Sequence, residues 1–383
     1  MSGSELPSTA WVVALSGLVG MGPARLGALL ARWEPEEAWR QVVAGAVHRD
    51  AQVVTRAGHL DATLAARWCQ EARRTDVATC WTAHAAAGVG VVARGEAGFP
   101  VPLADDPEPP AVLFHQGSLA TLEHPRVAVV GTRRCTYAGR ATARALGRDL
   151  AAAGVCVVSG LARGIDGEAH HGALEAQHAG GAAPAAVVGT GLDVVYPRTN
   201  TELWSGVAAV GTVLSEYPLG TRAQAWRFPA RNRIIAALAD VVVVVESHAR
   251  GGSLHTVDAA LERDRPVMAV PGPVRSPASA GTNELLVAGC GPVRDAEDVV
   301  TALGLEAPAV ARGRSDPCPP DRPLAVVLLD ALGWEPATID EVAARVDAPL
   351  AAVAVELSRM ERDGLLVRHG SWLERRQRRE ARR

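Results

Sequence analysis

The 383-residue sequence contains no lysine, so its 39 Lys and Arg positions are all arginine. This absence excludes a lysine Schiff base, a pyridoxal phosphate anchor and the lysine of the phosphate-binding GxxxxGK[ST] loop. The six cysteines include no CxxC pair, so neither a zinc ribbon nor a disulfide framework is expected. Nothing in the sequence therefore calls for a cofactor or a bound metal, and we expect none.

Long hydrophobic runs are absent as well. Apolar stretches such as Leu324–Leu329 and Val241–Val245 are far shorter than the roughly 20 residues of a membrane span. The amino-terminal residues show neither a cationic start nor an extended apolar core, so no secretory signal is expected. We therefore expect a cytoplasmic protein without a membrane partner. Because the formal net charge is only −3, any anion site must be local.

Residues 1–100 have the spacing of a small helical domain, with apolar side chains at Leu26, Leu29 and Trp33. Within this part, the turn from Gly17 to Leu26 is similar to the hairpin of a helix-hairpin-helix (SAM-like) unit. Glycines in such a hairpin let backbone amides approach a nucleic-acid phosphate. A ligand-free turn between helices explains the same residues and is the favoured interpretation.

Residues 103–305 alternate short β-branched runs with helical segments, the pattern of a parallel sheet with crossover helices. Because the predicted strands are wholly apolar, both faces of the sheet should be covered. The fold class is therefore α/β, with an extended Rossmann-like domain. The candidate strands are Val127–Val130, Val155–Val158, Ala185–Val188, Val213–Leu214, Val241–Val245 and Val267–Val270.

The carboxyl-terminal part has three segments. Residues 306–323 are proline-rich and are predicted to be a linker, and residues 374–383 form an arginine-rich tail. Between them, residues 324–373 have the pattern of three helices and a hairpin, which predicts a winged helix. Thr338 followed by Glu341 forms a candidate capping box.

Several predicted strands end in glycine, hydroxyl and arginine residues, where ligands bind in open parallel sheets. The first ends at Gly131 and Arg133, and the second at Ser159–Gly160, with Arg163 after it. By itself each turn is about as consistent with a structural turn as with a phosphate site. Gly252–Ser253 repeats the pattern at a later strand end, whereas Gly189–Gly191 is best explained as a turn.

Residues 221–233 give the clearest functional signal. This segment holds four arginines within 12 residues, interleaves Trp226 and Phe228, and lies in an acid-free stretch from Tyr217 to Ala239. Arginines neutralise phosphates and flat rings stack on bases, so the combination fits unpaired nucleic acid. A solvated basic face, with the rings in the core, is the alternative.

Seven motifs in order resemble those of the DNA processing protein A family (DprA, also called Smf). They read VAVVGTRRCTYAGR, VVSGLARGIDGEAHHGAL, GTGLDVVYP, LSEYPLG, FPARNRIIAALAD, VVVVESHARGGSLHTVDAALERDRPVMAVPG and GTNELL. The resemblance implies a homodimeric, non-enzymatic protein that binds single-stranded DNA and loads the RecA recombinase onto it. It also implies a set of DNA-contacting residues: Gly131, Arg133, Ser159, Gly160, Arg163, Phe228, Arg231, Asn232, Arg233, Gly252 and Ser253. The family commonly has a smaller residue where this chain has Val257.

Two other functions remain as alternatives. A Rossmann-like enzyme that cleaves a nucleoside phosphate is indicated by PG followed by GTNE at Pro271–Glu284, although eight residues separate Gly272 from Gly281. A regulator that reads double-stranded DNA through the winged helix has less support. Its candidate recognition helix, residues 350–363, carries only two arginines against three acidic residues.

Overall fold

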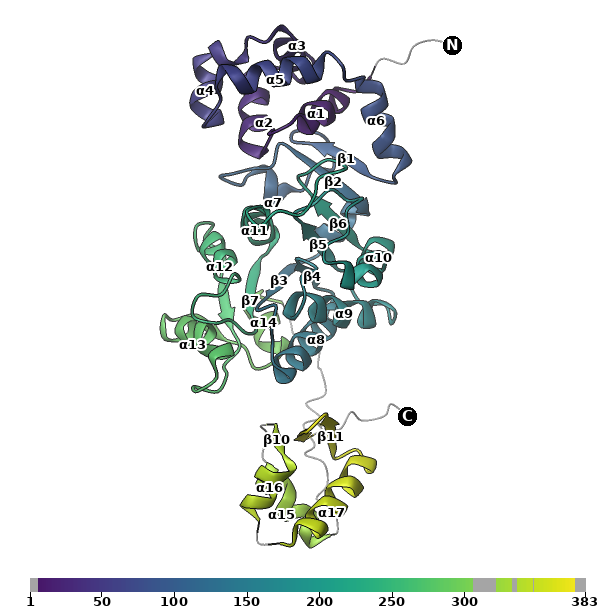
Figure 1. Ribbon diagram of the computed structural model, residues 1–383, viewed down its shortest axis with the longest axis vertical. Helices are drawn as coiled ribbons and strands as arrows, with labels where there is room; N and C mark the ends of the chain where they lie inside the picture. Colours follow the sequence, from purple (N-terminus) through teal and green to yellow (C-terminus); the bar gives the residue numbers. More distant parts are fainter. Residues whose placement is uncertain (1–5, 306–321, 333–335, 347, 376–383) are drawn as a thin grey trace. The chain divides into compact units, whose positions relative to one another are not determined.

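The computed structural model describes residues 6–305, 322–332, 336–346 and 348–375. The chain divides into two compact units, Met1–Pro308 and Ala309–Arg383 (Figure 1). The predicted linker up to residue 321 and the tail from residue 376 lie outside the described residues. Where the structure is described, it contains no helix long and apolar enough to cross a membrane.

The first unit begins with a cluster of helices beside the β1 edge of the sheet (Figure 1). Three of these helices begin at an aspartate whose carboxylate accepts backbone N–H groups of the first turn, namely Asp50, Asp61 and Asp76. Trp68 is fully buried at the centre of the cluster. The helices are α1 (Ser8–Gly17), α2 (Pro23–Leu30), α3 (Pro35–Ala44), α4 (Ala51–Ala57), α5 (Ala62–Ala72) and α6 (Val77–Ala86).

A nine-stranded sheet follows, in the order β1-β2-β6-β5-β4-β3-β7-β8-β9. All neighbouring strands from β6 to β9 are parallel, and β2 pairs antiparallel with both β1 and β6. The strands are β1 (Gly90–Ala93), β2 (Val112–Gly117), β3 (Arg126–Val130), β4 (Cys156–Ser159), β5 (Ala185–Val188), β6 (Thr212–Ser215), β7 (Val241–Val244), β8 (Val267–Ala269) and β9 (Gly291–Pro292).

The six predicted strands correspond to β3–β8, so the parallel α/β fold is confirmed. The edge strands β1 and β9, and β2 next to β1, were not predicted. Strand β1 lies within the range 1–100 that was predicted to be helical, yet it pairs with β2 at the edge of the sheet. The exact boundary between the helical domain and the sheet domain stays a prediction.

Helices cover both faces of the sheet, as its apolar strands require. Alternate residues of β3 show this directly, because Val127 and Val129 pack in one core and Ala128 and Val130 in the other. Helices α8 (Tyr137–Ala152), α9 (Ile165–Gln177) and α14 (Ala296–Ala302) cover the first face. The opposite core contains α7 (Val101–Ala104), α11 (Arg227–Leu238) and α12 (Leu254–Leu261). Helices α10 (Thr201–Val210) and α13 (Ala280–Val287) complete the layers.

The second unit is a winged helix, as predicted. Helices α15 (Pro323–Leu332), α16 (Ile339–Arg345) and α17 (Leu350–Arg362) pack around Leu328 and Leu357, and a three-stranded sheet forms the wing. Its strands are β10 (Ala337–Thr338), β11 (Leu366–His369) and β12 (Trp372–Arg375). The predicted capping box is confirmed, since Thr338 and Glu341 exchange side-chain to backbone hydrogen bonds.

Candidate nucleic-acid interface

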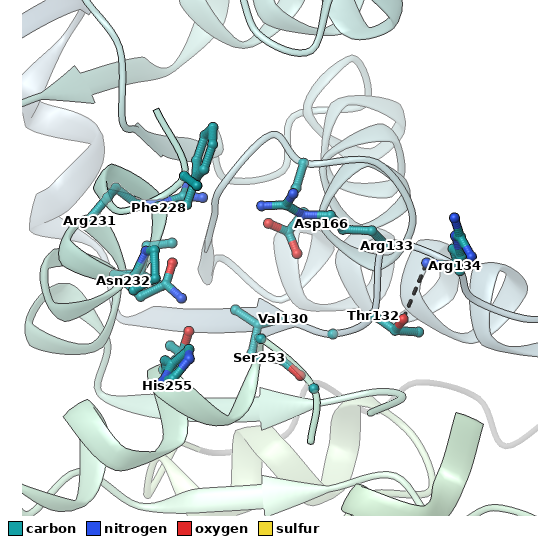
Figure 2. Close-up of a pocket in the computed structure, with 18 of the residues that line it drawn as sticks. Val130, Thr132, Arg133, Arg134, Asp166, Phe228, Arg231, Asn232, Ser253 and His255 are labelled. Atoms are coloured by element: carbon teal, nitrogen blue, oxygen red, sulfur yellow. Dashed lines mark hydrogen bonds between the residues drawn. The ribbon is translucent and has the colours of Figure 1, made fainter. Parts of the chain in front are cut away.

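A pocket of about 730 Å³ lies at the carboxyl ends of the parallel strands. Its walls come from the segments that follow β3, β4, β5, β6 and β7, and from helices α11 and α12. Figure 2 shows Phe228, Arg231 and Asn232 facing Arg133 across this space, with Asp166 between them. The lining contains three arginines, Arg133, Arg134 and Arg231, and one carboxylate, Asp166, so its formal charge is positive.

Helix α11 supplies one continuous wall. Phe228, Arg231, Asn232 and Ile235 all line the pocket, and their spacing of three and four residues places them on one helix face. Arg231 is only 4% exposed, and its Nη1 donates a hydrogen bond to the Val187 carbonyl at the end of β5. Burial lowers the pKa of Arg231 to about 10, so this guanidinium remains charged at neutral pH.

Asp166, in the first turn of α9, is the buried acid of the pocket. Its Oδ2 accepts the backbone N–H of Gly160 at 3.2 Å. Burial raises the pKa of Asp166, and the charges of Arg231 and Arg133 oppose that rise. The helix begins after Gly164, so Asp166 lies within its first turn and does not cap it.

Arg133 is exposed and is held against an aromatic pair. Its guanidinium carbon lies 5.1 Å from the centre of the Phe228 ring, and Phe228 stacks on Tyr196 with ring centres 5.3 Å apart. Cation–π contact orients the guanidinium without neutralising it. Arg133, Phe228 and Tyr196 therefore form a positively charged edge of the pocket in which the guanidinium has a fixed orientation. Phe228 is contacted there by the Tyr196 ring and by the Arg133 guanidinium.

Glycine at position 160 is required by close packing against Arg231. A Cβ atom there would lie 2.0 Å from Nη1 of Arg231, far inside van der Waals contact. At Gly252 the opposite holds, because a Cβ atom there would have nothing within 4 Å and the backbone faces open space. Gly252 and Ser253 both line the pocket, and the Ser253 hydroxyl donates to Oγ of Ser247 at 2.9 Å.

The amino terminus of α8 is already occupied by a protein carboxylate. Thr136 donates its backbone N–H to Glu246 at 2.9 Å and its hydroxyl to the same carboxylate at 2.5 Å. Gly139 leaves the space for this group, since a Cβ atom there would lie 2.3 Å from the carboxyl carbon. A helix amino terminus favours an anion, and here Glu246 is that anion. The turn after β3 therefore offers the side chains of Arg133 and Arg134 to a ligand rather than the α8 terminus.

Seven of the eleven residues expected to contact DNA line the pocket: Gly131, Arg133, Phe228, Arg231, Asn232, Gly252 and Ser253. Four do not. Ser159 is fully buried, and its hydroxyl donates to the Val129 carbonyl at 2.7 Å. Gly160 packs closely against the guanidinium of Arg231. Arg163 is exposed outside the lining. Arg233 forms an ion pair with buried Glu216 and donates to the Glu108 carbonyl at 2.7 Å.

Other lining residues were not predicted from the sequence as site residues. Tyr196, Gln224, His248 and His255 belong to this group. Tyr196 lies five residues after Gly191, in the loop that follows a predicted strand, and this position could have identified it. The segment Pro271–Glu284, which motivates the enzymatic alternative, lies outside the lining, and Asn283 ties its loop to Gly272 by hydrogen bonds of 3.1 and 3.3 Å.

The sequence matches known proteins over most of its length. The family model described as DNA recombination-mediator protein A matches residues 90–304, and that of the DprA winged helix domain matches residues 314–371. Protein Smf of Escherichia coli (strain K12) is 36% identical over 275 residues, which cover 70% of this chain and 72% of that protein. DNA processing protein DprA of Streptococcus pneumoniae is 41% identical over 202 residues, or 53% of this chain and 70% of the relative.

Two solved structures are similar. The X-ray structure of DNA processing protein A from Streptococcus pneumoniae superimposes with a TM-score of 0.64 at 30% identity, covering 78% of this chain and 98% of that one. A structure of DNA processing protein A from Helicobacter pylori, described for its single-stranded DNA binding mode, gives a TM-score of 0.51 at 29% identity. That match covers 56% of this chain and 95% of the other.

Proposed function

The chain belongs to the DNA processing protein A (DprA/Smf) family, and from this membership and the strand-end pocket we propose that it binds single-stranded DNA. The observation that carries the proposal is the pocket itself. Two arginines of the β3 turn face Arg231 of α11 across it, with Tyr196 and Phe228 beside them. Cationic groups next to flat rings suit a strand whose phosphates and bases are both accessible.

The structure also supports a particular kind of recognition. Arginine contacts to phosphate carry no sequence information, and ring stacking tolerates every base. We therefore propose binding with little sequence preference and strong salt dependence. The Helicobacter pylori relative, described as binding single-stranded DNA, supports the same ligand.

The role in the cell is proposed from the family. The description of the matching family as a recombination mediator supports a protein that protects single strands during DNA processing or uptake and loads RecA onto them. We propose that it does so as a cytoplasmic homodimer and without enzymatic turnover. Assembly of RecA filaments on protein-coated single strands tests this role, and sedimentation of the free protein tests the dimer.

Fluorescence anisotropy with labelled oligonucleotides across a salt series tests the binding itself. Arg133→Ala should weaken binding by about 1–3 kcal/mol and reduce the salt slope by about one, since it removes one charge-assisted phosphate contact. Arg163→Ala is the matched control, because that exposed arginine lies outside the lining and should change the affinity less. Equal affinities for single and double strands, or an unaltered Arg133→Ala protein, would contradict the assignment.

A further inference from the structure

We propose that Trp226 is a second stacking platform, which holds an unpaired nucleobase outside the pocket on the β6–α11 loop, residues 216–226. The proposal rests on the proposed function and adds a binding residue and a direction for the strand. Trp226 is 54% exposed and is absent from the hydrophobic cores of the described residues. Core packing therefore does not account for a tryptophan at this position.

Helix capping does not account for it either. Trp226 is the N-cap residue of α11, where serine, threonine, aspartate or asparagine would accept a backbone N–H, and its side chain makes no such bond. Instead the ring presents a large apolar surface to solvent directly before the α11 wall. An exposed aromatic next to a charged pocket is typical of a binding surface.

The ring is fixed in place before any ligand arrives. Its Nε1 donates to Oε1 of Gln224 at 2.8 Å, and the guanidinium of Arg227 lies 5.0 Å from its centre. The same guanidinium lies 5.0 Å from the ring of buried Tyr217, whose edge contacts Trp226 at 6.4 Å and an angle of 83°. A ring held by three contacts loses little conformational entropy when a base stacks on it.

The platform is continuous with the pocket. Ala223, Gln224 and Ala225 line the pocket and lead directly to Trp226. Two of these three residues are alanines, and the third, Gln224, accepts the indole N–H. A strand whose phosphates contact Arg133 and Arg231 can therefore extend along this loop and place a following base on Trp226.

The loop also gives the strand a direction. Tyr217 and Pro218, at the start of the loop, lie against Met21, Gly22 and Pro23 at the amino terminus of α2. The Trp226 platform thus extends the site from the sheet toward the helical cluster. Phe228, by contrast, is only partly exposed and already stacks on Tyr196, whereas Trp226 is the more exposed of the two rings.

A comparison of normal and base-free strands tests the proposal. Full-length protein is titrated with labelled oligothymidylate and with an abasic phosphodiester of equal length, each across a salt series. Trp226→Ala should weaken oligothymidylate binding roughly tenfold, within the range for one stacked base, and leave binding of the abasic strand and both salt slopes unchanged. Trp226→Phe should restore most of the affinity, because it retains a ring.

Two controls separate the possible failures. Leu261→Ala removes a side chain of matching exposure, 57%, at the far end of α12 and should bind both strands as the wild type does. Arg133→Ala should weaken both strands and lower the slope. If Arg133→Ala does so while Trp226→Ala binds oligothymidylate normally, or loses equally on both strands, the platform is refuted and the proposed function stands. If the wild-type protein binds neither strand, both are refuted.

Tryptophan fluorescence tests the proposal by a second route, which does not depend on the Trp226→Ala protein folding well. Stacked bases quench indole emission, so titration of the wild type with oligothymidylate should lower its tryptophan fluorescence by more than titration of Trp226→Phe does. Equal quenching in the two proteins would overturn the proposal, since eight other tryptophans would then produce the whole signal.

Discussion

Replacement of Arg233 by methionine should destabilise the protein and leave DNA binding intact, although its motif resembles a DNA contact. Arg233 and Arg231 are two positions apart on α11, about 200° around the helix, so they face opposite sides. Arg231 lines the pocket, whereas Arg233 pairs with Glu216, whose side chain is 3% exposed. The substitution therefore leaves a buried carboxylate without its counter-charge.

The expected loss follows from that burial. Removal of one partner of a buried ion pair costs about 3–5 kcal/mol, which lowers the unfolding temperature by roughly 6–15 °C at about 2–3 °C per kcal/mol. Burial already raises the pKa of Glu216, with Arg233 opposing the rise. Because the folded state binds this proton more tightly, stability falls as the pH rises through the raised pKa. The loss in Arg233→Met should accordingly be largest at neutral pH and above, and smaller in acid.

Thermal unfolding at several pH values measures this effect. The double variant Arg233→Met with Glu216→Gln should recover part of the stability and flatten the pH dependence, because the unpaired charge is gone. Oligonucleotide binding, measured well below the unfolding temperature, should keep its wild-type affinity and salt slope. Weaker binding with a lower salt slope in a fully folded Arg233→Met protein would refute the reasoning and restore Arg233 as a phosphate contact.

Four further substitutions test helix packing and the charge of the site. Gly139→Ala should displace the Glu246 carboxylate from the α8 terminus and cost about 1–3 kcal/mol in denaturant unfolding. Gly147→Ala places a Cβ atom 2.0 Å from a backbone oxygen of α9 and should lower the free energy of unfolding by at least as much. Gly27→Ala, whose Cβ atom would have nothing within 4 Å, should instead raise it by about 0.5–1 kcal/mol. Asp166→Asn should strengthen oligonucleotide binding at pH 8 by about 1–2 kcal/mol. This is the repulsion between the Asp166 carboxylate and bound phosphates roughly 8–15 Å away at an effective dielectric constant of about 20. Because the pKa of Asp166 is raised, wild-type affinity should increase as the pH falls, and anisotropy should show no such increase in Asp166→Asn.

The parallel sheet was predictable because buried strands leave a strong local signal. The run Val241–Val245, which contains β7, is apolar, β-branched and bounded by Asp240 and Glu246. Strands β1 and β2 give no such signal. Strand β1 is four residues that begin with glycine, and β2 ends in His115, Gln116 and Gly117, so its burial falls along its length. Their antiparallel pairing comes from tertiary contacts that no short window contains.

The site was predictable as a set of strand ends but not as a set of side chains. Motif spacing identifies the segment around Arg231 and Arg233, and only the helix phase separates the pocket-facing residue from the ion-paired one. Likewise, the Glu246 contact with Thr136 joins positions 110 residues apart, so the α8 turn alone gives no sign that its terminus is occupied. Ser159 does not line the pocket for a related reason, because its hydroxyl donates to the neighbouring strand within the buried sheet.

The placement of acidic groups explains why arginines dominate this site. Glu246 occupies the amino terminus of α8, and Asp166 lies in the first turn of α9, so carboxylates already interact with two helix ends next to the pocket. A phosphate that approached either terminus would meet a like charge. Binding must then rely on guanidinium groups that extend beyond these acids. Exposed Arg133, which packs against the Phe228 ring, is such a group. Such contacts act on the backbone of any strand, so salt should alter affinity far more than base sequence does.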